Sequence, residues 1–88
     1  MADRAEHLRD LRAFLRTIER PEQPLDAVDE DTSLVAAGLI DSLAVLEIVA
    51  YLETRYGFDF AESGVDPEEL TSIRGILDCI ERAVSAGL

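Results

Sequence analysis

Apolar residues recur at intervals of three and four along this chain, and that spacing places side chains on one face of an α-helix. The first stripe predicts a helix over residues 3–19 and consists of Leu8, Leu11, Leu15 and Ile18. Asp3 can cap the start of this helix, and Pro21 cannot continue it. Alternation with period two is confined to residues 57–60, which is too short for a sheet, so we expect an all-α fold.

Three more helices are expected downstream. The second spans 41–56, and its expected buried face consists of Leu46, Val49, Leu52 and Tyr56. A short third helix over 66–70 starts with Asp66-Pro67, a cap followed by a proline at the first helical position. The fourth spans 72–86, and its expected buried stripe is Ile73, Ile76 or Leu77, Ile80 and Val84. These patterns predict a four-helix bundle.

A long loop over 20–40 separates the first two helices. Within it, we expect Asp31 or Thr32 to cap a short turn that Gly38 closes in a left-handed conformation. The chain has 88 residues, which suffices for one domain, so we assign residues 1–88 to a single domain.

The charge of the chain limits its partners. Nineteen carboxylates oppose eight arginines, and the net charge is −11, so nucleic acid is not an expected partner and a basic protein surface is. Charged residues from Asp3 onward replace the apolar region of an export signal, and no run is apolar and long enough for a membrane span. With a single cysteine, the chain is expected in a reducing cytoplasm.

The chain is poorly supplied with reactive side chains. His7, the only histidine, is expected on a helix surface, and Cys79 is expected to be a small buried residue. One His and one Cys cannot form a zinc site. The acidic run 29–31 lacks a calcium loop's glycine and glutamate, because Leu34 and Ile40 stand in those positions. We therefore expect neither an enzyme nor a metal protein.

The segment Gly38-Leu39-Ile40-Asp41-Ser42-Leu43 admits two interpretations. Asp41-Ser42 before an apolar run is an ordinary helix start, and the protein would then be an acidic helical adaptor for a basic partner. Alternatively, Ser42 lies on the first turn with its hydroxyl facing solvent, where free backbone N–H groups and the helix dipole favour an attached phosphate.

Several motifs in this order resemble the acyl carrier protein family over nearly the whole chain. They are the Gly38 to Leu43 segment, an apolar helix with Glu47 and Glu53, and Tyr56-Gly57-Phe58. The resemblance implies a bundle of the acyl carrier protein type. It also implies that a phosphopantetheinyl transferase attaches 4′-phosphopantetheine from coenzyme A to Ser42, and that the arm's thiol holds acyl or aminoacyl groups as thioesters.

The same resemblance assigns roles to individual residues. Asp41 is the capping neighbour of the attachment serine, and Leu43 is the apolar residue beside the arm. The implied partner-facing surface consists of Leu43, Glu47, Ala50, Tyr51 and Thr54. Further implied partners are a loading ligase or adenylation enzyme and an acyltransferase or synthase, and the carrier is expected to be a monomer.

Departures from the family pattern bear on the pathway. Fatty-acid carriers of this family usually place an acid directly after Ser-Leu, where this chain has Ala44, and further acids where it has Thr54 and Arg55. Modular peptidyl carriers usually read Gly-Gly-x-Ser-Leu. We therefore expect a free-standing carrier from polyketide or nonribosomal peptide pathways, with a fatty-acid carrier as an alternative. Four residues could shelter an acyl chain, although we expect them to be core: Leu46, Val49, Ile73 and Ile76.

Overall fold

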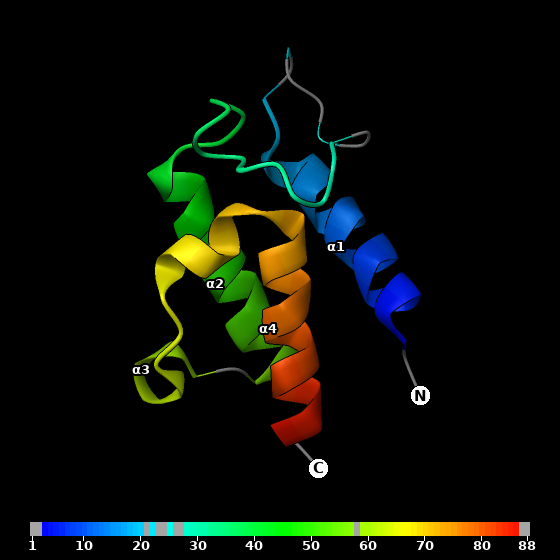
Figure 1. Cartoon of the computed structure of the whole chain (residues 1–88), viewed down its shortest axis with the longest axis vertical. Helices are drawn as coiled ribbons and strands as arrows, with labels where there is room; N and C mark the ends of the chain where they lie inside the picture. The colour runs from blue at the N-terminus through cyan, green and yellow to red at the C-terminus, as the bar shows by residue number, and fades with distance from the viewer. Residues whose placement is uncertain (1–2, 21, 23–24, 26–27, 58, 87–88) are drawn as a thin grey trace.

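The computed structural model describes residues 3–20, 22, 25, 28–57 and 59–86. Its elements follow the chain in the order α1 (Arg4–Ile18), α2 (Ser42–Tyr56), α3 (Phe60–Ser63), the 3₁₀ helix η1 (Pro67–Thr71) and α4 (Ile73–Ala86) (Figure 1). No strand occurs in these residues, so the expected all-α fold is confirmed. Pro21 and Phe58, which the sequence argument used, lie outside the described residues.

Local capping chemistry sets the helix starts. The Asp3 carboxylate accepts a hydrogen bond from the Glu6 amide at 3.0 Å, and Asp66 accepts one from Glu68 at 2.9 Å. Both caps are as expected. The short third helix is a 3₁₀ helix, and a further turn of helix, α3, precedes it with Asp59 as its cap. The sequence analysis missed α3 because its four residues are too few to show a period.

α4 contacts α1, α2 and η1 and forms the centre of the bundle (Figure 1). The fully buried side chains of the core are Leu11, Leu15, Leu25, Leu34, Ile48, Leu52, Leu70, Ile73, Ile76, Leu77, Cys79 and Ile80. The expected stripe of the fourth helix is buried except at Val84, which is partly buried. In the first helix Leu11 and Leu15 are buried, while Leu8 and Ile18 are partly buried. The expected buried position of Cys79 is confirmed as well, and burial raises the pKa of its thiol.

The expected buried face of the second helix is wrong in part. Leu52 is buried, but Leu46 is 64% exposed, and the side that faces the core also carries Ala44 and Ile48. The reason is that apolar residues occupy almost every side of α2, so that periodicity does not distinguish the core side from the solvent side. The packing of α4 and η1 against α2 makes that choice.

His7 is buried, which corrects the expectation of a surface histidine. Only 6% of the residue is exposed, because it lies one helical turn before Leu11 and therefore on the buried face of α1. Its Nδ1 atom lies 3.3 Å from the hydroxyl of Tyr56, and the two rings meet edge to face. His7 is therefore a partnered core residue.

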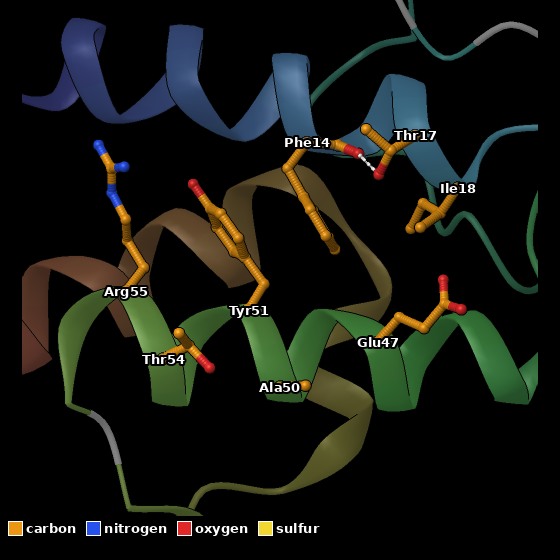
Figure 2. A pocket seen from close by; sticks show the side chains of 8 residues that line it. All are labelled: Phe14, Thr17, Ile18, Glu47, Ala50, Tyr51, Thr54 and Arg55. Atoms are coloured by element: carbon orange, nitrogen blue, oxygen red, sulfur yellow. Dashed lines mark hydrogen bonds between the residues drawn. The ribbon is translucent and has the colours of Figure 1, made fainter.

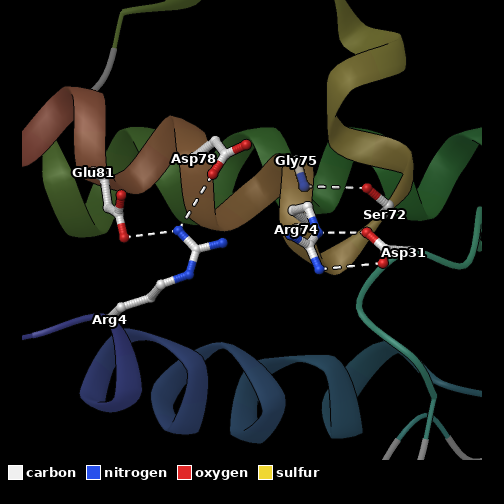
Figure 3. A network of polar contacts seen from close by, with 7 residues as sticks. All are labelled: Arg4, Asp31, Ser72, Arg74, Gly75, Asp78 and Glu81. Atoms are coloured by element: carbon white, nitrogen blue, oxygen red, sulfur yellow. Dashed lines mark hydrogen bonds and ion pairs between the residues drawn. The ribbon is translucent and has the colours of Figure 1, made fainter.

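The long loop is fastened to α4 and η1. The Leu34 amide donates to the Thr71 carbonyl at 2.6 Å, and the Arg74 amide donates to the Glu30 carbonyl at 2.9 Å. Arg74 also forms an ion pair with Asp31 (Figure 3). These bonds hold the loop against the start of α4. The loop then leads into α2.

The turn within this loop closes as expected at Gly38, whose φ is +75°. Its cap, however, is Ser33 and neither Asp31 nor Thr32. The Ser33 hydroxyl accepts a hydrogen bond from the Ala36 amide at 3.2 Å, while the Asp31 carboxylate is engaged by Arg74. The cap was ambiguous in the sequence because three consecutive residues can each serve as one.

Candidate functional site

Ser42 is the first residue of α2 and is exposed. The carboxylate of Asp41 accepts a hydrogen bond from the Ala44 amide at 2.9 Å, so Asp41 is the N-cap, as expected. The Ser42 hydroxyl makes no hydrogen bond to any residue that the structure describes. The first amides of a helix lack intrahelical partners, and this end of α2 is therefore positively polarised. A free hydroxyl thus lies at a site that favours an attached anion.

Exposed apolar side chains surround Ser42. Leu43 is 65% exposed, Leu46 64% and Val35 39%. They contribute to an open groove of about 490 Å³, which we call the serine groove; it is lined by Val35, Ser42, Leu43, Val45, Leu46, Pro67, Glu68 and Thr71. Large apolar side chains that remain in water next to one another mark a surface that binds something.

Val35 was not expected as a site residue, and Leu46 was considered for contact with cargo but expected to be core. Val35 belongs to a loop turn, where no periodicity gives its direction. Leu46 carried a usable signal, because α2 has more apolar residues than one buried face can hold. Some of them therefore had to be exposed.

The expected partner face is divided between two grooves. Leu43 lines the serine groove, whereas four other residues lie on the side of α2 that faces α1 (Figure 2). That second groove, the α1–α2 groove, has a volume of about 710 Å³ and is lined by Phe14, Thr17, Ile18, Glu47, Ala50, Tyr51, Thr54 and Arg55. Glu47, Ala50 and Thr54 are exposed, as a partner surface requires.

Tyr51 packs toward α1 and is only partly exposed. Its ring stacks on Phe14 with centroids 4.2 Å apart, and Figure 2 shows the two rings side by side between the helices. Burial, with a smaller contribution from the neighbouring Tyr56, raises the pKa of Tyr51 to about 12. Tyr51 therefore connects α1 to α2 and offers a partner only the edge that faces the groove.

The charge pattern of α2 has a structural explanation at Ala44. Ala44 is only 8% exposed and lies on the core side of the first turn, where a carboxylate would lose its hydration. The absence of an acid at position 44 therefore does not indicate which partner enzymes the protein binds. Arg55, by contrast, is exposed, and it pairs with Asp10 of α1 at 3.0 Å.

The four residues considered for an internal cargo site differ in burial. Ile73 and Ile76 are fully buried core residues, as expected, while Val49 is half-buried and Leu46 is exposed. Across the described ranges, no three or more His, Cys, Asp or Glu side chains are grouped as metal ligands. None of the helices in those ranges has both the length and the apolar character needed to cross a bilayer.

A helical bundle that presents a free serine hydroxyl at a helix N-terminus, beside exposed apolar surface, has the arrangement of a carrier domain. The profile of the family described as "Phosphopantetheine attachment site" matches residues 9–80. The chain belongs to this family, which confirms the resemblance to acyl and peptidyl carrier proteins, and its prosthetic group is 4′-phosphopantetheine. No curated protein and no solved structure matches the chain.

The residues around Ser42 fit such a group. Its phosphate is an anion, and the N-terminal amides of α2 attract anions. Its pantetheine chain is long and partly apolar, and the serine groove offers apolar surface directly beside the hydroxyl. Arg20, whose Nη2 atom lies 3.7 Å from Asp41, adds a positive charge near the same helix end.

Proposed function

We propose that Ser42 is the attachment residue and that the protein is a carrier. It holds acyl or aminoacyl intermediates as thioesters and delivers them to partner enzymes. The observation that carries this proposal is the exposed hydroxyl of Ser42 at the N-terminus of α2, which has no hydrogen bond to a described residue and lies within the residues matched by the family. The arm supplies the thiol to which cargo is bound.

The chain's own residues position the arm. Asp41 holds the first turn of α2 through the Ala44 amide, and this presents the Ser42 hydroxyl to solvent. Leu43, together with Leu46 and Val35, offers apolar contacts to the arm or to a partner. The serine groove is open to solvent, which suits an arm that must detach from it to reach one partner enzyme after another.

The chemistry of transfer belongs to the partners. His7 is buried against Tyr56, and burial raises the pKa of the Cys79 thiol, so that little of it is the reactive thiolate at neutral pH. The partners we propose are a phosphopantetheinyl transferase, a loading ligase or adenylation enzyme, and an acyltransferase or synthase. With a net charge of −11, the carrier is suited to basic docking surfaces that bind fast and release fast.

Polyketide or nonribosomal peptide biosynthesis is the pathway class we propose, with a monomeric carrier in the cytoplasm. Support comes from the end of α2, where Thr54 and Arg55 are exposed in place of further acids. Adding a charge there tests the idea. Thr54→Glu should improve loading by a fatty-acid synthase acyltransferase, and Ser85→Glu, the same change on the exposed face of α4, should not. Equal loading of both variants and the wild type contradicts the assignment.

Attachment is tested by intact mass measurement. The protein is incubated with coenzyme A and a broad-range phosphopantetheinyl transferase. The wild type should gain the mass of one phosphopantetheine, Ser42→Ala should gain none, and Ser85→Ala should gain as much as the wild type. An unmodified wild type, beside a known carrier that is modified in the same tube, would favour the acidic adaptor instead.

A further inference from the structure

Arg20 lies beside the N-terminus of α2, although it follows directly on α1 and its C-cap Glu19. We infer that Arg20 is the counter-ion of the phosphate that joins the arm to Ser42. This inference rests on the proposed attachment at Ser42. It assigns a phosphate-binding role to a residue outside the segment that defines the attachment site.

The chain after α1 is held in the direction that this role requires. The Glu19 amide donates to the Leu15 carbonyl at 2.9 Å and ends the helix. The Glu19 carboxylate then accepts a hydrogen bond from the Leu25 amide at 2.6 Å, and Arg12 donates to the Leu25 carbonyl at 3.4 Å. These bonds tie Leu25 back to the end of α1, next to Arg20.

The contact between Arg20 and Asp41 is loose. Its 3.7 Å separation exceeds hydrogen-bond distance, whereas Arg4 reaches Glu81 at 2.7 Å (Figure 3). The Asp41 carboxylate is already engaged on one side, because its Oδ1 atom accepts from the Ala44 amide while its Oδ2 atom is the one nearest Arg20. The guanidinium has five N–H donors, and it makes no hydrogen bond to another residue in the part of the chain that the structure describes.

A phosphodiester on Ser42 changes the charges at this place. It puts a negative charge one residue from the Asp41 carboxylate, and like charges at short range repel. Asp41 must stay in place to cap α2. A guanidinium can donate to two phosphate oxygens at once, which an ammonium group does less well. Arg20 is therefore placed to balance both anions, and the half-exposed side chain has room to turn between them.

This role differs from simple neutralisation of Asp41, because it requires Arg20 to respond to loading. In ¹⁵N-labelled wild-type protein, the Nε–H resonance of Arg20 should shift when the apo form is converted to the holo form. The shift should shrink in about 1 M salt, where the screening length is about 3 Å. An Arg20 resonance that is identical in the two forms overturns the inference, and this comparison needs no variant.

The ³¹P resonance of the holo protein gives an independent measurement. It should shift in Arg20→Gln and stay at the wild-type position in Arg9→Gln, a matched loss of charge on an exposed side chain of α1. A wild-type ³¹P position in Arg20→Gln overturns the role of Arg20. Intact mass separates the two hypotheses, because a wild type that gains no phosphopantetheine disproves attachment itself, whereas a loaded protein with an unresponsive Arg20 disproves only this inference.

Discussion

Gly75→Ala should destabilise the protein, although alanine is normally the better helix residue. Gly75 lies inside α4, and its amide donates to the Ser72 hydroxyl at 3.1 Å (Figure 3). A Cβ at Gly75 overlaps the carbonyl oxygen of Glu69 and lies 2.9 Å from the carbonyl carbon. The backbone of η1 therefore approaches α4 so closely that only glycine fits.

The magnitude follows from competing terms. Alanine gains about 1 kcal/mol over glycine in a helix interior. Against this, overpacking costs about 1–3 kcal/mol, and displacing η1 exposes part of Leu70, which is fully buried, at a further cost of about 2 kcal/mol. The balance is a loss of about 2–4 kcal/mol, or a fall in Tm of about 10–20 °C for a domain of this size.

Urea and thermal unfolding of Gly75→Ala measure this loss directly. Ser85→Ala, on the exposed face of the same helix, is the control for helix propensity and should not lower stability. If Gly75→Ala is as stable as the wild type or more stable, the close packing of η1 on α4 is refuted. The Tm of both variants should be compared in the apo form, so that differences in loading do not contribute.

Three further predictions concern the cap, a tyrosine and the cysteine. Asp41→Ala should cost about 1 kcal/mol of unfolding free energy, and Asp41→Asn, which keeps an acceptor for the Ala44 amide, only a few tenths, so equal losses in urea unfolding would argue against the cap. Because the pKa of Tyr51 is raised from 10.0 to about 12 in the folded protein, its contribution to stability is complete below pH 10 and is lost as the pH rises toward 12. Tyr51→Phe should remove that part of the pH dependence. If the unfolding free energy of the variant falls with pH as steeply as that of the wild type, another group is responsible. Cys79, which is fully buried with a raised thiol pKa, should resist maleimide labelling in the native protein and react in urea, and rapid native labelling would contradict its burial.

Local chemistry allowed much of the fold to be predicted. Asp3, Asp41 and Asp66 cap helices where the sequence indicated, because a cap depends on a side chain and an amide two or three residues away. Gly38 closes its turn for an equally local reason, the positive φ. The cap of that turn was not predictable, since Asp31 is drawn away by Arg74, which lies far along the chain.

The candidate site divides in the same way. The segment from Gly38 to Leu43 by itself determined that a serine would stand at the start of a helix, and the family match supports its role. The tertiary structure alone decided that Leu46 is exposed beside it, because α2 is apolar on most sides and its neighbours choose the buried one.

Arg20 shows the same limit most clearly. Nothing near Arg20 in the sequence connects it to Ser42, and its place beside Asp41 follows from how the end of α1 lies against the start of α2. Helix caps and helix periods depend on chain neighbours and can be predicted from the sequence, whereas the groups that surround a site depend on how separate segments pack. The sequence therefore determined where the arm's serine stands, and the packing of α1, α4 and η1 decided what that serine meets.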